Sequence, residues 1–120
     1  MIKILVVDDD PDTISTFKYG LENNRFEVDS YNDPLLALEN FKANFYDLLL
    51  IDIRMPGMTG FKLFQKIKRI DNKAKVCFIT AFEAYYKALL EEFPYLNPKC
   101  FIRKPISIDE LVKRIKKELN

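Results

Sequence analysis

Five short apolar runs alternate with segments of helical periodicity along the 120 residues of this chain. We expect strands at these runs, near residues 2–7, 26–30, 47–51, 75–80 and 99–103. Strands and helices that alternate with short connections form a parallel sheet, with right-handed crossovers and helices on both faces. The pattern therefore predicts one α/β domain over residues 1–120, a length typical of a single domain.

Most of the expected helices begin at a sequence that favours helix initiation. Asp10-Pro11 and Asp33-Pro34 each place an N-cap Asp before a Pro at the first helical position. The third helix is expected to begin near Thr59, and the fourth to cover roughly residues 82–93. The last begins with a capping box, the Ser-x-x-Glu sequence Ser107–Glu110. The sequence thus predicts five helices.

The polarity of the runs predicts the order of the strands. The first, third and fourth runs are almost purely apolar, which is typical of central strands covered on both faces. The second run, Phe26–Ser30, alternates, and the fifth carries Lys99 and Arg103, so both fit the edges of the sheet. The order 2-1-3-4-5 satisfies both requirements and describes a flavodoxin-like, doubly wound sheet.

Composition excludes several classes of function. The 19 basic and 18 acidic residues leave a net charge of +1, which does not support nucleic acid or a membrane surface as the main partner. No apolar run approaches the roughly 20 residues of a membrane helix. No signal peptide is visible either, so we expect a cytoplasmic protein. The absence of His excludes Ser-His and Cys-His catalysis.

The two cysteines, Cys77 and Cys100, lie inside strand-like apolar runs. We expect both to be buried, reduced thiols that act as small hydrophobic side chains. Two thiols without His and without a CxxC sequence do not indicate a structural zinc site.

Polar side chains end four of the expected strands. They are Asp8 and Asp9, Asp52, Thr80 and Lys104. In an open α/β sheet, ligands bind just outside the carboxyl ends of the strands. Three carboxylates close together are costly unless a cation or a shared proton relieves them, and Mg²⁺ prefers such oxygen ligands. A hydroxyl and an ammonium group beside them suit a phosphoryl group. The sequence therefore predicts one site for a divalent cation and a phosphoryl group.

Four short motifs in this order closely resemble those of the response-regulator receiver domain of two-component signalling, and the resemblance covers the whole chain. The motifs are Leu5–Asp10, Asp52–Gly60, Ile79–Ala81 and Arg103–Pro105. The resemblance implies a switch that accepts a phosphoryl group on an aspartate, rather than a metabolic enzyme. It also implies that the domain promotes its own phosphotransfer and dephosphorylation.

The resemblance implies a role for each carboxylate of the site. Asp52 is expected to be the phosphoacceptor. Asp9, Asp52 and the backbone carbonyl of Arg54 are expected to bind Mg²⁺ directly, and Asp8 mainly through bound water. These assignments are carried over from the family to the matching positions of this sequence.

The resemblance also implies which residues contact the phosphoryl group and which residue passes on the signal. Thr80 and Lys104 would contact it, and the Lys104–Pro105 peptide is expected to be cis. Phe101 occupies the position of an aromatic switch, although it could also be a static edge-strand side chain.

The phosphodonor would be a sensor histidine kinase or a histidine phosphotransfer protein. The signal would pass through the face formed by the fourth helix, fifth strand and fifth helix to a downstream protein, an output domain or a second copy.

The chain departs from the family pattern around this face. The stretch from Thr80 to Lys104 is about two residues longer than is common, and residues 93–98 replace the usual small residues. Arg54 and Phe82 flank the site, and their bulk predicts a long-lived phosphoryl group. Three tyrosines could form an exposed aromatic patch on the same face: Tyr85, Tyr86 and Tyr95.

Other interpretations fit the acidic run less well. Asp10, or Asp9, could serve only as a helix N-cap. A nucleotide-binding domain of this topology would need Gly, Ser or Thr after the first strand, and the acidic run Asp8–Asp10 would repel phosphate. A phosphatase of the haloacid dehalogenase type would need Thr or Val where this chain has Asp12, and it would be longer. A degenerate receiver is excluded because none of the five site residues is missing.

Overall fold

The structure, a computed structural model, describes residues 1–81, 91 and 100–120. It is built on a five-stranded, all-parallel sheet in the order β2-β1-β3-β4-β5, so the predicted order is confirmed. The strands lie within about two residues of the predicted runs: β1 Lys3–Val7, β2 Glu27–Tyr31, β3 Leu48–Asp52, β4 Val76–Thr80 and β5 Phe101–Arg103.

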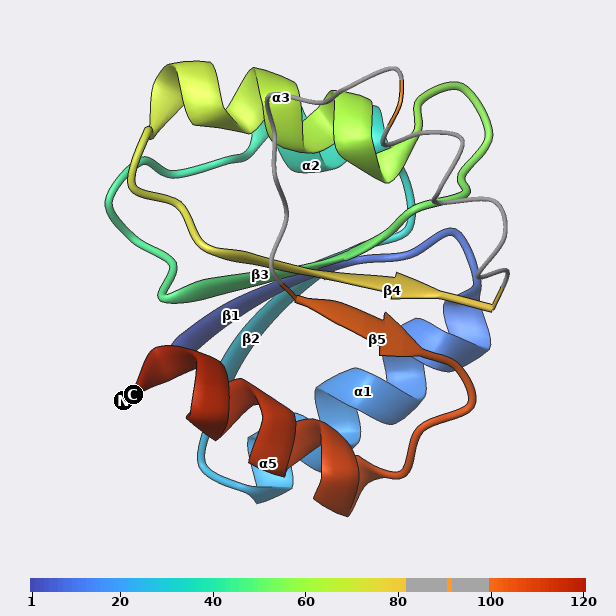
Figure 1. Ribbon diagram of the computed structural model, residues 1–120, viewed down its shortest axis with the longest axis vertical. Helices are drawn as coiled ribbons and strands as arrows, with labels where there is room; N and C mark the ends of the chain where they lie inside the picture. The colour runs from blue at the N-terminus through green and yellow to red at the C-terminus, as the bar shows by residue number, and fades with distance from the viewer. Residues whose placement is uncertain (82–90, 92–99) are drawn as a thin grey trace.

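Helices cover both faces of this sheet (Figure 1). The described helices are α1 Pro11–Asn23, α2 Pro34–Glu39, α3 Gly60–Ile70 and α5 Ile108–Leu119. α1 and α5 lie on one face and α2 and α3 on the other, as a doubly wound fold requires (Figure 1). The helix predicted over residues 82–93 would be α4 and, apart from residue 91, lies outside the described residues. None of the described helices is long and apolar enough to cross a membrane.

The predicted helix caps are all present. Asp10, Asp33, Thr59 and Ser107 each accept a hydrogen bond from a backbone N–H two or three residues ahead. A cap of this kind is worth about 1 kcal/mol relative to Ala. The caps therefore fix the residue at which each of these four helices begins.

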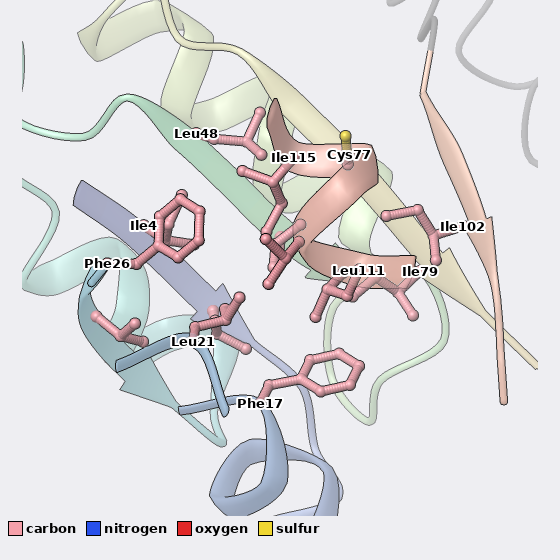
Figure 2. Close-up of a cluster of buried hydrophobic side chains, with 14 of the residues drawn as sticks. Ile4, Phe17, Leu21, Phe26, Leu48, Cys77, Ile79, Ile102, Leu111 and Ile115 are labelled. Carbon is pink, nitrogen blue, oxygen red and sulfur yellow. The ribbon is translucent and has the colours of Figure 1, made fainter. Parts of the chain in front are cut away.

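Two hydrophobic cores pack against the two faces of the sheet. Alternate residues of each strand point to opposite faces, so Ile4 and Val6 enter the core under α1 and α5, while Leu5 and Val7 enter the core under α2 and α3. Figure 2 shows the first core, where side chains of α1 and α5 meet those of the strands. Burial of both faces explains why the central strands are apolar throughout.

Cys77 and Cys100 form a disulfide bond, so the expectation of reduced thiols is wrong. Their burial is confirmed, since the two residues are 0% and 1% exposed. The pairing follows from strand register. Phe78 lies opposite Phe101, which places the preceding residues opposite each other with their Cα atoms 4.6 Å apart, within the range that a disulfide spans. This register between strands far apart in the sequence is not visible in the apolar runs themselves.

Gly60 allows α3 to begin directly against the end of β3. Its N–H donates a hydrogen bond to the carbonyl oxygen of Ile53 at 2.8 Å. A Cβ atom at this position would overlap the backbone carbonyl oxygen of Asp52. The absence of a side chain therefore sets how closely α3 approaches the strand that carries Asp52.

We expect Gly60→Ala to lower the free energy of unfolding by about 3 kcal/mol or more, because backbone cannot yield as a flexible side chain does. Gly57→Ala is the matched control: Gly57 has φ +83 with open space around its Cβ position. Only the cost of the left-handed conformation applies there, about 1–2 kcal/mol. Urea unfolding of both variants measures the difference, and equal costs would contradict the close approach at Gly60.

Candidate functional site

Three carboxylates meet where β1 and β3 end. Asp8 and Asp9 follow β1 directly, and Asp52 is the last residue of β3. The two strands are neighbours, with Val7 opposite Ile51, so their ends reach the same edge together. Carboxylate oxygens of the three Asp residues lie within 4.8 Å of one another. The structure thus brings together the acidic cluster that the sequence predicts.

Lys104 supplies a positive charge to this cluster. Its Nζ donates a hydrogen bond to Oδ2 of Asp8 at 2.6 Å, and the backbone N–H of Asp10 donates to Oδ1 of Asp8 at 3.0 Å. The backbone N–H of Lys104 donates to the carbonyl oxygen of Thr80 at 2.9 Å, which fixes the lysine at the end of β5. The Lys104–Pro105 peptide is cis, as expected. Asp8 is therefore held from two sides, and it is only 1% exposed.

Asp52 is also buried, with 7% of its surface exposed. Burial raises the pKa of its carboxyl, and the negative charge of Asp8 raises it further. Lys104 opposes these effects, whereas a hydrogen bond with Asp9 adds to them, and the pKa reaches about 8. Without a cation, Asp52 therefore holds a proton near neutral pH, which is how a crowded carboxylate cluster relieves its own repulsion.

An open cavity of about 590 Å³ lies above these carboxylates. Its volume is about twenty times the ~30 Å³ that one water molecule occupies in the liquid. The cavity can therefore hold a phosphoryl group together with a hydrated cation. The residues that line it are Asp8, Asp9, Asp10, Asp52, Arg54, Met55, Pro56, Ala81 and Lys104.

The loop after β3 forms one rim of the cavity. Ile53 donates its N–H to Ile79 and accepts a hydrogen bond from the N–H of Gly60, at 3.1 and 2.8 Å. Ile53 is thus held on both its N–H and its carbonyl side, and the exposed Arg54 that follows it lines the cavity. The loop therefore carries Arg54 from the end of β3 to the cavity.

Thr80 and Phe101 are not among the described residues that line the cavity. Thr80 ends β4 and is buried. Phe101 is half-buried, and its ring stacks on Phe78 with centroids 5.9 Å apart and meets the edge of Phe61 at 6.3 Å. Strand alternation puts Thr80, Phe78 and Phe101 on the same face of the sheet. This arrangement could couple Thr80 to Phe101, and the switch role of Phe101 stays a prediction.

Some cavity residues received no role from the sequence. Met55, Pro56 and Ala81 line the cavity. Each of them lies within a few positions after a predicted site residue in the sequence. This proximity is the one sequence signal that could have predicted their place in the cavity. Phe82 and the three tyrosines of the predicted aromatic patch lie outside the described residues.

The raised pKa of Asp52 predicts how stability depends on pH. The folded protein keeps a proton on Asp52 up to about pH 8, whereas the unfolded chain releases it near pH 4. The folded state therefore binds more protons between these values, and this contribution to stability is lost as the pH rises. Asp52→Asn removes it. We compare the free energies of unfolding in buffer without divalent cations. The value for the variant minus the value for wild type should rise by up to about 1.4 kcal/mol per pH unit between pH 6 and 8.

Urea unfolding of both proteins across this range measures the difference, and the comparison cancels the titration of groups that do not interact with Asp52. A difference that stays constant with pH would show that Asp52 is not protonated in the folded state.

Comparisons with known proteins agree with this site. Residues 4–116 match the model of the response regulator receiver domain family. The receiver protein CpdR of Brucella abortus is 32% identical over 119 residues, covering 99% of this chain and 98% of CpdR. The transcriptional regulatory protein PrrA of Mycobacterium leprae is 31% identical over 116 residues, covering 95% of this chain and 48% of PrrA. The chain thus spans about half the length of several curated relatives it matches.

A solved structure shows the same likeness. The response regulator protein TrrA from Thermotoga maritima, in complex with Mg²⁺-BeF, superposes with a TM-score of 0.82 at 32% identity, covering 98% of each chain. The chain belongs to the response regulator receiver domain family. It is therefore a phosphorylation-dependent signalling domain of a two-component system, with the flavodoxin-like fold that its sequence predicts.

Proposed function

We propose that the carboxylate of Asp52 is the phosphoacceptor of this receiver. The observation that carries the proposal is its position: Asp52 ends β3 at the cavity, with Asp8 and Asp9 on one side and Lys104 across from them. We propose a sensor histidine kinase or a histidine phosphotransfer protein as the donor. The cytoplasmic location expected from the sequence stays a prediction.

The cluster fits Mg²⁺ as the cofactor. Three carboxylates within 4.8 Å form an all-oxygen donor set, and burial and the charge of Asp8 raise the pKa of Asp52 although Lys104 opposes them. Asp9, Asp52 and the backbone carbonyl of Arg54 would hold the ion, and Asp8 would act through bound water. When bound, the ion neutralises negative charge on the carboxylates and on the phosphoryl oxygens.

The protein groups each have a defined task in the transfer. An oxygen of deprotonated Asp52 forms the new bond to phosphorus while the bond from phosphorus to the donor nitrogen breaks. Lys104, which already reaches into the cavity from β5, pairs with a phosphoryl oxygen as a point charge. The hydroxyl of Thr80 donates a hydrogen bond to another oxygen. The open cavity leaves room for the donor to approach in line with Asp52.

The signal would leave through the side of the sheet where β5 lies. A Thr80 drawn toward the phosphoryl group vacates space on the face that it shares with Phe101, so the ring can reorient against Phe78. This is a two-state shift biased by a local charge change. A downstream protein, an output domain or a second copy of the domain would recognise the altered surface.

Phosphorylation can be tested directly with acetyl phosphate and Mg²⁺. We expect wild type to gain one phosphoryl group that is stable to acid and labile to base, because an acyl phosphate is hydrolysed readily by hydroxide. Asp52→Asn should gain none, whereas Asp12→Asn, which changes an exposed carboxylate in the first turn of α1, should label like wild type. Intact mass measures the label. Unchanged labelling of Asp52→Asn would overturn the assignment.

Metal binding gives a separate prediction. Mg²⁺ at 100 times its dissociation constant should stabilise wild type by about 2.7 kcal/mol. Asp9→Ala should abolish this effect and raise the stability of the metal-free protein, because one of three repelling charges is gone. Asp12→Ala serves as the control and should keep the full response. Thermal unfolding with and without Mg²⁺ measures both quantities, and a full Mg²⁺ response in Asp9→Ala would contradict its role as a ligand.

A further inference from the structure

The disulfide joins the two strands that carry the proposed switch residues. Cys77 belongs to β4, which ends at Thr80, and Cys100 directly precedes Phe101 in β5. We propose that the Cys77–Cys100 pair is a redox-controlled crosslink, which holds β5 against β4 when oxidised and lets β5 move when reduced. Its effect on signalling rests on the function proposed above, whereas its effect on the strands does not.

The pairing of β4 with β5 is short enough for one covalent bond to matter. Among the described residues, three register pairs join the strands, and β5 lies at the edge of the sheet with β4 beside it. The N–H of Phe78 donates to the carbonyl oxygen of Cys100, and the N–H of Lys104 donates to that of Thr80, both at 2.9 Å. The disulfide fixes the end of this ladder that lies away from the cavity. Without it, β5 is held by the hydrogen bonds of the β4–β5 ladder and by packing.

In the sequence, the crosslink also joins the two ends of the stretch that holds the predicted fourth helix, which belongs to the proposed output face. The two cysteines are separated by 23 positions in the sequence. Residues 82–90 and 92–99 lie between them in the chain. The crosslink therefore joins the two ends of the stretch whose length and composition depart from the family pattern.

The sulfur atoms are protected by α5. Both cysteines belong to the core under α5, where Figure 2 shows Cys77 together with Ile115. A carboxylate oxygen of Glu118, in the last turn of α5, lies within 4.8 Å of both sulfur atoms. Glu118 is partly balanced by Nε of Arg114 at 3.7 Å. An incoming thiolate must therefore displace the end of α5 and approach a negative charge, which makes exchange slow.

The redox step is thiol–disulfide exchange with a low-molecular-weight disulfide. One protein thiolate attacks the external disulfide, which forms a mixed disulfide and releases one small thiolate. The second protein thiolate then attacks the protein sulfur of the mixed disulfide and releases the other. The two protein thiols lose two electrons and two protons, and the external disulfide becomes two thiols. In a reducing compartment such disulfides are usually transient, catalytic or redox-sensing, which favours a reversible role.

The state of the strands can be tested in wild type alone, with oxidised glutathione and dithiothreitol as the probes. Alkylation after denaturation should count no free thiols in the oxidised form and two in the reduced form. Amide hydrogen exchange of Phe78 and Lys104, which donate across β4 and β5, should speed up at least tenfold on reduction. The amide of Glu27, which donates to Ile2 between β2 and β1, should not change.

Two results would overturn the crosslink. Free thiols after treatment with oxidised glutathione would show that the pair does not form. An equal change at Glu27, Phe78 and Lys104 would show a disulfide that stabilises the whole domain without acting on β5. The double variant Cys77→Ala/Cys100→Ala should exchange at one rate under both conditions, like the reduced wild type.

The signalling effect is read separately with Mg²⁺ and beryllofluoride, a phosphoryl mimic. We expect equal NMR shifts at the cavity amides of Asp9 and Ala81 in both redox forms, and shifts at Phe101 at least twofold larger in the reduced form. Equal shifts at Phe101 would overturn the effect on signalling. If the cavity amides do not shift in either form, the proposed function fails, and the exchange experiment still decides whether the crosslink acts on β5.

Protection by Glu118 has its own readout. Glu118→Gln should speed reduction of the disulfide by dithiothreitol several-fold, because the repulsion of the incoming thiolate is removed. Glu110→Gln, on the same helix and paired with Lys113 away from the sulfur atoms, is the matched control and should not change the rate. Equal rates for both variants and wild type would show that Glu118 does not protect the disulfide.

Discussion

The functional site depends on three carboxylates that the sheet holds close together in a largely buried place. Asp8, Asp9 and Asp52 are held together because β1 and β3 are adjacent parallel strands that end at the same level. Lys104 pairs with Asp8 and leaves the other two unbalanced, so Asp52 keeps a proton in the absence of a cation. A cation or a bound phosphoryl group would therefore change the charge balance of a preformed site.

Much of the fold could be predicted because the sequence signals are local and consistent. Apolar runs, N-cap residues and Pro at the first helical position indicate where elements begin, and the polarity of the runs separates central from edge strands. The cavity could be predicted for a related reason. In a parallel sheet the residues that follow each strand must meet at one edge, so Asp8, Asp52 and Lys104 needed only the strand order to be placed together.

The features that could not be predicted depend on the register between neighbouring strands and on the direction of side chains. The disulfide requires Cys77 and Cys100 to lie opposite each other across two strands, and the apolar runs do not encode this offset. Thr80 is expected to contact the phosphoryl group; the structure shows it buried at the end of β4, and its contact with the group stays a prediction. Whether it moves forward depends on the phosphorylated state, which no pattern of residue types describes.

The alternation of side chains along β5 has a consequence for how the domain can be tuned. Phe101 packs into the core under α2 and α3, whereas Cys100 and Ile102 pack into the core under α5. The strand is a single layer between two cores, so a change of volume on one side displaces the residues that serve the other. Evolution could therefore adjust the output of this receiver from beneath α5, on the side of the sheet opposite Phe101, while every residue of the acidic site stays as it is.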